Sequence, residues 1–180
     1  MSKNKIINRA TLAIILCSSF PMLIVGCYFV HIPWNMQRLN LTESDLGLAI
    51  LIFGIFFLIS NQFSARFLVP RIGTKIVMSS SMILISFGTV LLVIVPNYPL
   101  FLLCSIPAGL GWGSSGPIGG IHTQLIEQHF KRIVTPYYAM GFNIGIFSGG
   151  LLAGYFINNN FIPWKVFLTL AFFGIFISFI

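Results

Sequence analysis

The segment GLGWGSSGPIGG, residues 109–120, holds six glycines in twelve positions and contains the pattern GxGxxG from Gly111 to Gly116. In dinucleotide-binding proteins this pattern cradles phosphates, because glycines let the backbone approach a pyrophosphate at a helix N-terminus. That chemistry needs a strand before the loop, a helix after it and an acidic residue about 20 positions further on. Here the segment follows the apolar stretch LFLLCSIPA and lies inside a longer apolar run. The pattern therefore does not predict a phosphate site.

Other residue types that perform chemistry are scarce. The chain has 3 acidic residues, 3 histidines and 3 cysteines. They form no metal-ligand cluster, no pair of carboxylates and no nucleophile with a base. We therefore expect no metal, no cofactor and no enzymatic activity. Cys17, Cys27 and Cys104 all fall in apolar segments and are expected to be buried thiols.

The composition indicates lipid as the main solvent. Hydrophobic residues make up 57% of the 180 residues and charged residues 7%, whereas a soluble domain has roughly a quarter charged residues. A stretch of about 20 apolar residues spans the hydrocarbon core of a bilayer, and it must be helical unless it alternates as a barrel strand. Six such stretches are predicted as helical spans, at about 10–33, 46–66, 76–95, 99–121, 134–157 and 162–180. The predicted class is an all-α polytopic membrane protein.

Basic residues predict the orientation, because Lys and Arg in short loops stay in the cytoplasm. Eight of them lie on one side of the predicted spans: Lys3, Lys5, Arg9, Arg66, Arg71, Lys75, Lys131 and Arg132. Only Arg38 and Lys165 lie on the other side. We expect both termini in the cytoplasm and a bacterial inner membrane as the location. The net charge of +7 is thus a topology signal, and we expect no nucleic-acid binding.

The six spans differ in composition. The third and sixth are nearly uniform in Ile, Leu, Val and Phe, and are expected to face lipid. The first and fourth carry Pro21 and Pro107 after similar Cys-Ser sequences, 86 residues apart. This weak repeat suggests two three-helix inverted repeats whose opening helices are kinked.

Glycines recur at helical spacing in two spans. Gly141, Gly145 and Gly149 follow one another every fourth residue, and Gly109, Gly113, Gly116 and Gly120 share one helical stripe. Small residues on a stripe let another helix approach closely. The spacing predicts packing surfaces, and it leaves open whether they are static or move.

The loop between the second and third spans carries a family motif. Compared with the signature GxLxDRxGRR, it keeps Leu68, Arg71, Gly73 and Lys75. With the six spans, it resembles the N-terminal half of a major facilitator superfamily transporter over essentially the whole chain. Arg66 and Pro70 replace the leading Gly and the Asp, so the resemblance implies an altered cytoplasmic gate.

Glu127 lies on the same predicted side of the membrane. The residue spacing favours a solvated pair with Lys131, four residues later on a helix. The resemblance offers an alternative, an inter-helix salt bridge with Arg71 or Lys75.

The resemblance implies secondary transport of a small solute by alternating access between two six-helix halves. Ser105 stands where the family often has an Arg, so proton coupling through that Arg does not carry over. Six spans make up one half of such a transporter. The expected partners are the bilayer, an unknown solute, and either a second six-helix half or a second copy of this chain. The alternative is a non-transporting, structural or channel-like membrane protein that needs a partner chain.

The predicted spans carry almost no charge, so a solute site would use amides, hydroxyls and aromatic rings. Seven residues are candidates for the cavity: Tyr28, Asn61, Gln62, Trp112, Ser114, Ser115 and Asn143. Each could instead join helices by hydrogen bonds. Trp34 is expected in the interfacial belt, and His31 is expected to be a solvated residue at the rim. Thr42 or Ser44 is expected to cap the second span.

Overall fold

The computed structural model describes residues 3–178, without the side chains of residues 3–8 and Ala10. Over this range the chain is helical apart from short connections and contains no strand. It forms six α-helices and a short π-helical segment: α1 (Lys3–Leu39), α2 (Glu43–Phe63), η1 (Ser64–Leu68), α3 (Val69–Ile94), α4 (Tyr98–Phe130), α5 (Thr135–Asn158) and α6 (Pro163–Ser178). The predicted all-α class is confirmed. The side chains of Lys3 and Lys5, and the last two residues of the sixth predicted span, lie outside the described part.

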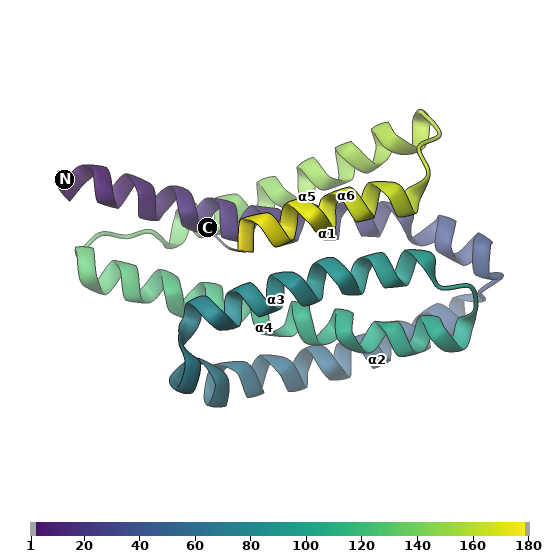
Figure 1. Ribbon diagram of the computed structural model, residues 1–180, viewed down its shortest axis with the longest axis horizontal. Helices are drawn as coiled ribbons and strands as arrows, with labels where there is room; N and C mark the ends of the chain where they lie inside the picture. Colours follow the sequence, from purple (N-terminus) through teal and green to yellow (C-terminus); the bar gives the residue numbers. More distant parts are fainter. Residues whose placement is uncertain (1–2, 179–180) are drawn as a thin grey trace.

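Most helices are apolar along their length. Three stretches are long and apolar enough to cross a membrane, namely Thr11–Leu39, Glu43–Ile94 and Thr135–Asn158. The second stretch contains both α2 and α3, which run in opposite directions on either side of η1 (Figure 1). The shorter helix α6 is also apolar. The chain is therefore an integral membrane protein.

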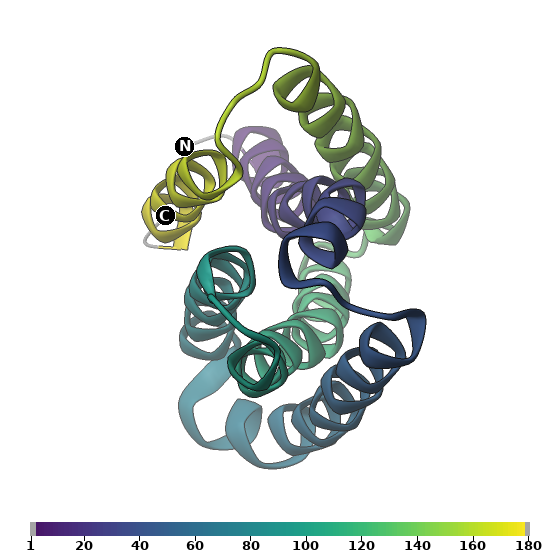
Figure 2. The ribbon, with the colours of Figure 1, turned by 90° about the vertical axis from the view of Figure 1, so that its right-hand side faces the viewer.

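The helices pack in neighbouring pairs, of which α1–α5 and α2–α4 are parallel and α3–α4 and α3–α6 are antiparallel. α1 lies along α5, α2 lies along α4, and α3 lies between α4 and α6 (Figure 2). The α1–α2, α3–α4 and α5–α6 connections gather at one end of the bundle, which we call the α1–α2 end (Figure 1). The α2–α3 and α4–α5 connections lie at the opposite end, the α2–α3 end.

The expectation that the third span faces lipid is wrong. Ten residues of α3 are buried, including the polar Ser81, Ser86 and Thr89. Ser81 Oγ lies 2.7 Å from the Oγ of Ser114 on α4, and Thr89 Oγ1 donates to the carbonyl of Ile85 at 2.8 Å. Small hydroxyl residues can return their hydrogen bonds to the helix and so tolerate burial between helices. In α6 one face is exposed and carries large apolar residues, while the opposite face packs on α3.

Local signals set the helix ends. Thr42 caps α2 in a capping box with Asp45, as predicted for Thr42. The helical backbone of α3 is broken at Gly73, where φ is 83° and ψ is 161°. In contrast, α1 and α4 continue as helices through Pro21 and Pro107. The expected kinks at these prolines do not interrupt either helix.

Candidate solute-binding site

Two glycine seams hold the helices that surround the candidate site. On α5, Gly141, Gly145 and Gly149 lie against the backbone of α1, and a side chain at any of them would overlap it. On α4, Gly109 and Gly113 lie in the same way against the carbonyl groups of Phe53 and Phe57 in α2. Without a Cβ the two backbones touch, which allows Cα–H···O contacts and close van der Waals packing. The seams therefore fix α1 to α5 and α4 to α2.

The rest of the predicted glycine stripe on α4 does not reach another helix. A Cβ on Gly116 or Gly120 would enter open space. Gly111, which was not part of the stripe, packs against α3 at Leu84 and Ile85. The glycines of α4 therefore face two different helices, since α2 and α3 cover different sides of α4.

A cavity of about 360 Å³ lies between α1, α2, α3 and α4, towards the α1–α2 end. Its wall is mainly aromatic and aliphatic, formed by Tyr28, Phe29, Ile32, Leu46, Ala49, Ile50, Phe53, Thr89, Leu92, Phe101, Ser105, Ala108 and Trp112. The rings of Phe53 and Trp112 meet edge to face, with centroids 5.9 Å apart. Two predicted cavity residues, Tyr28 of α1 and Trp112 of α4, thus both line this cavity, together with Ser105. A mostly apolar cavity with few polar groups is typical of a site for a small organic molecule.

Polar side chains follow one face of α1, which begins at the cavity residue Tyr28. Tyr28, His31, Asn35 and Arg38 follow one another at i, i+3, i+7 and i+10. Arg38 donates to the carbonyl of Val95 at 2.6 Å and to Asn35 Oδ1 at 3.2 Å, and its guanidinium lies 4.9 Å from the ring centre of Trp34. Arg38 itself does not line the cavity, whose wall carries no charged side chain.

Sequence reasoning missed the contacts of Asn35 and Arg38 at the end of α1. Arg38 was read only as a marker of topology, and the first span was expected to end near residue 33. The helix continues to Leu39 and brings both side chains onto the face of Tyr28. The helical spacing of the four polar residues was the signal that could have revealed them.

His31 is buried, with 1% of its surface exposed, so the expectation of a solvated residue at the rim is wrong. Its Nδ1 lies 2.8 Å from the carbonyl oxygen of Cys27. A carbonyl only accepts, so Nδ1 carries the proton in this contact. The ring also meets Phe167 of α6 edge to face at 5.2 Å. Burial follows because α1 extends beyond His31 and α6 covers this face.

The other predicted cavity residues lie elsewhere. Ser114 is buried against Ser81 of α3, and Ser115 donates to the carbonyl of Trp112 in its own helix. Asn143 is exposed and donates to the carbonyl of Ala139. Asn61 is half-buried and Gln62 is exposed near the end of α2. The described structure thus does not gather these five residues around the cavity.

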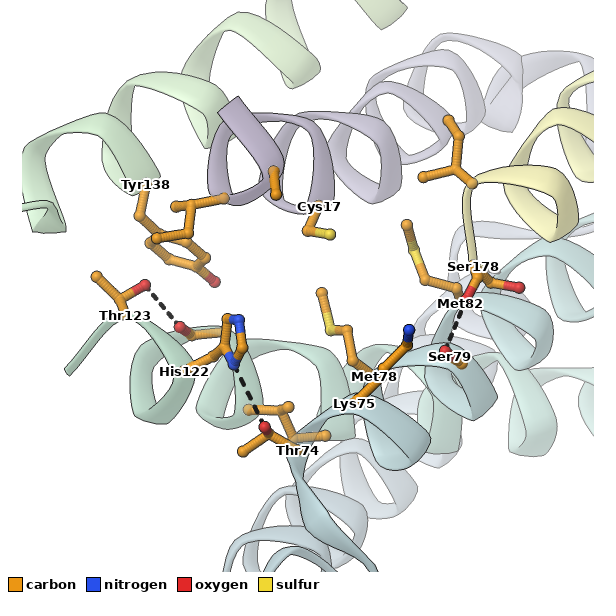
Figure 3. A pocket seen from close by; sticks show the side chains of 15 residues that line it. Cys17, Thr74, Lys75, Met78, Ser79, Met82, His122, Thr123, Tyr138 and Ser178 are labelled. Atoms are coloured by element: carbon orange, nitrogen blue, oxygen red, sulfur yellow. Dashed lines mark hydrogen bonds between the residues drawn. The ribbon is translucent and has the colours of Figure 1, made fainter. Parts of the chain in front are cut away.

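A second cavity of about 190 Å³ lies at the α2–α3 end. Figure 3 shows side chains from several helices around it, among them Cys17 of α1, Lys75 and Met78 of α3, His122 of α4 and Tyr138 of α5. Thr74 Oγ1 and His122 Nδ1 lie 3.3 Å apart and connect α3 to α4. Lys75, predicted for the gate loop, therefore borders a cavity beside the helix break at Gly73.

The remaining gate-loop residues are distributed along the α2–α3 connection. Leu68 ends η1 and is half-buried, while Arg71 and Gly73 are exposed in the first turns of α3. Their role in gating stays a prediction.

Glu127 closes the α4–α5 connection. Its Oε1 accepts hydrogen bonds from the backbone N–H of Val134, from the backbone N–H of Thr135 at 2.7 Å and from Thr135 Oγ1 at 2.9 Å. These bonds hold the pKa of Glu127 below its usual value. Lys131 has left the helix, with φ 52° and ψ 42°, so a helical i to i+4 pair with Glu127 is wrong. The carboxylate bonds to its own connection rather than to Arg71 or Lys75.

Comparison with known proteins identifies the family of this helical bundle. The family model described as Major Facilitator Superfamily matches residues 14–180. Quinolone resistance protein NorA from Staphylococcus aureus strains Mu50 and N315 is 24% identical over 132 residues, which is 73% of this chain and 34% of the relative. The chain therefore spans about a third of the length of these relatives. From the match across nearly all of its residues, the chain belongs to the Major Facilitator Superfamily.

Proposed function

We propose that this chain forms the N-terminal six-helix half of a secondary transporter that moves a small organic solute by alternating access. The family match over residues 14–180 is the observation that carries the proposal. The NorA relatives are named for quinolone resistance, which favours an exported organic compound as the solute. The chain acts as a carrier and not as an enzyme in this proposal.

The helix pairing supports two inverted three-helix repeats. If α1 corresponds to α4 and α2 to α5, the pair α1–α5 corresponds to the pair α4–α2. Both pairs are extensive, and both contain a glycine seam. Repeats of this kind place solute sites near the middle of the membrane between helices. We propose six spans with both termini in the cytoplasm, so that the α2–α3 end faces inwards.

Two exposed apolar faces support a partner for the half-size bundle. On α2, Leu48, Leu51, Ile55 and Leu58 share one face, and all are exposed. On α5, an equivalent exposed row is formed by Met140, Ile144, Phe147 and Leu151. Lipid could cover either row, and so could a second six-helix half or a second copy of this chain. We propose a second half, because transporters of this family rock two halves around a central site.

Flux through proteoliposomes tests the proposal. The purified chain, alone and coexpressed with a candidate second half, would be reconstituted with an imposed proton or sodium gradient and a quinolone as the solute. A carrier gives flux that saturates with solute concentration and collapses with the gradient. Flux that rises linearly without saturation would support the channel-like alternative. A paired complex without flux would support the non-transporting alternative.

A further inference from the structure

We infer that the cavity at the α2–α3 end binds a single-chain aliphatic anion, with its charged head beside Lys75 and its chain directed along α3 towards Met82. This site lies towards the opposite end of the bundle from the candidate solute site. The inference goes beyond the proposed function and does not depend on it. It comes from one cation without an acidic partner, from the order of polar and apolar residues along the cavity, and from the cavity's size.

The charge of Lys75 determines the charge of the ligand. Lys75 is the one charged side chain in the described wall of this cavity, and Figure 3 shows it directed inwards. Among the described residues it has no hydrogen-bond or ion-pair partner. None of the three acidic residues lines the cavity: Glu43 and Asp45 begin α2 at the other end, and Glu127 is bonded to its own connection. An anionic ligand therefore complements this wall.

Polar and apolar residues are separated along the length of the cavity. Lys75 and His122 are exposed and lie near the α2–α3 end of their helices. Met82 and Ile118 also line the cavity, but they are buried, with 2% and 0% of their surfaces exposed. On α3, Met82 follows Lys75 by seven residues, which is roughly 10 Å along a helix. The cavity thus leads from an exposed polar rim to a buried apolar floor, as an amphiphilic ligand requires.

The floor of the cavity favours an aliphatic chain. Its hydroxyl groups already donate to carbonyl oxygens: Ser79 Oγ bonds to Ser178 and Ser178 Oγ to Ile175, both at 2.7 Å. Neither hydroxyl is therefore free to donate to a ligand. Met78 and Met82 line the same cavity (Figure 3). Methionine side chains are unbranched and flexible, so they adapt to the irregular shape of an alkyl chain.

The rim holds further hydrogen-bond donors. Tyr138 of α5 lines the cavity, and its hydroxyl has no hydrogen-bond partner among the described residues. Its ring lies close to α4 because Gly119 has no side chain, and a Cβ at Gly119 would overlap it. A neutral imidazole carries one proton, so His122 Nε2 is a donor when Thr74 donates to Nδ1. The rim therefore has donors on α4 and α5 besides the cation on α3, and it has no acidic acceptor.

The cavity's size and exposure limit the ligand to a single chain with a small head. About 190 Å³ is too little for the two acyl chains of a phospholipid, whereas one medium-length chain is comparable. Because Lys75 is exposed, its charge alone holds an anion only weakly in water. Burial of the chain against the apolar floor supplies the remaining affinity. An alkanoate has both parts.

Binding to the purified full chain in phosphatidylcholine nanodiscs tests the inference, with binding to empty nanodiscs subtracted. The probes are radiolabelled octanoate, its neutral amide octanamide and the cation octylammonium. We expect about one octanoate site per chain. Octanoate should bind about tenfold or more tightly than octanamide, as for a charged hydrogen bond, and octylammonium should bind least.

Three variants locate the ligand. Lys75→Gln should weaken octanoate binding by about tenfold and change octanamide binding by less than about twofold. Lys75→Arg keeps the charge and should stay within about threefold of the parent. Cys17→Leu adds bulk to the cavity wall without changing the charge, so it should weaken octanoate and octanamide alike, by about tenfold or more.

Lys131→Gln is the matched control. Lys131 is an exposed cation at the same end of the bundle, but it does not line the cavity. Its loss should change octanoate affinity by less than about twofold. Each variant is compared only if its helicity and elution volume match the parent.

Several outcomes would overturn the inference. These are no octanoate binding above empty nanodiscs, equal affinity for octanoate and octanamide, or equal losses in Lys75→Gln and Lys131→Gln. Unchanged binding in Cys17→Leu would place the ligand outside the cavity. Nanodiscs that contain phosphatidylglycerol test the size argument: an unchanged number of octanoate sites supports a free single-chain anion, and loss of the site would assign the cavity to a membrane lipid instead. Flux measurements decide the carrier proposal separately, because octanoate binding needs no transport.

Discussion

Gly145 of α5 lies so close to the carbonyl oxygen of Ser19 in α1 that a Cβ at Gly145 would overlap this oxygen. Gly141 and Gly149 meet the same helix one turn before and one turn after. The absence of a side chain at three successive turns thus determines how closely α1 and α5 approach. Because α1 also carries Tyr28, Phe29 and Ile32, this seam positions one wall of the candidate site.

Replacing Gly145 by Ala should therefore weaken the bundle. Overlap with backbone forces the helices apart, at a cost of about 1–3 kcal/mol. Thermal unfolding of the purified chain in detergent, followed by circular dichroism, measures the effect. Gly154→Ala is the control on the same helix, because its Cβ enters open space and Ala favours helix by about 1 kcal/mol. Equal midpoints for the two variants would contradict the role of the seam.

The sequence predicted the helices well and their neighbours poorly. Runs of apolar residues locate helices because the bilayer requires internal hydrogen bonds. They do not reveal which face of a helix meets protein, since lipid and protein interiors are similarly apolar. Hence α3 was expected to face lipid, although Ser81 and Thr89 lie inside the bundle. Glycine spacing indicated tight seams, but only the structure assigns α5 to α1 and α4 to α2.

The candidate site was predictable only in part. Tyr28 and Trp112 were chosen by residue type, and they share one cavity. Asn143 and Ser114 have the same chemistry, but their hydrogen bonds go to Ala139 and Ser81. His31 is buried because α6, more than 130 residues later in the chain, covers it. No local sequence pattern predicts contacts between residues so far apart in the chain.

Any other residue at the helix break at Gly73 should destabilise the chain. Its φ of 83° with ψ of 161° belongs to a region that is essentially restricted to glycine. We expect Gly73→Ala and Gly73→Asn to destabilise the chain by about 1–3 kcal/mol each, although nothing crowds the position. Lys131→Gly is the control variant, because Lys131 has an ordinary left-handed backbone conformation that glycine adopts more easily. This variant should gain up to about 1 kcal/mol in the same unfolding assay. A neutral Gly73→Asn would contradict the assigned backbone.

Glu127 should make stability depend on acid pH. Its pKa is lowered by hydrogen bonds from the backbone of Thr135 and Val134, relative to a usual value of 4.5. A lowered pKa in the folded state means that the stabilisation is present above pH of about 4.5 and is lost as the pH falls through the folded value. Glu127→Gln should therefore unfold at a lower temperature than the parent at pH 7, and the gap should shrink below pH of about 4.5. Glu43→Gln, an exposed acid at the first turn of α2, serves as the control. A gap that persists at pH 3 would show that the carboxylate charge is not the cause.

The proposed orientation predicts which end of the bundle reagents can reach. Lys131 and Lys165 are both exposed, but they lie at opposite ends of the bundle. In a variant whose three native cysteines are replaced by Ala, Lys165→Cys should react with a membrane-impermeant maleimide in intact spheroplasts. Lys131→Cys should react only after the membrane is broken, because the excess of basic residues holds the α2–α3 end in the cytoplasm. Mass shift of the purified chain measures labelling. Labelling of Lys131→Cys in intact spheroplasts would invert the topology, and the cavity near the α1–α2 end would then lie towards the cytoplasm.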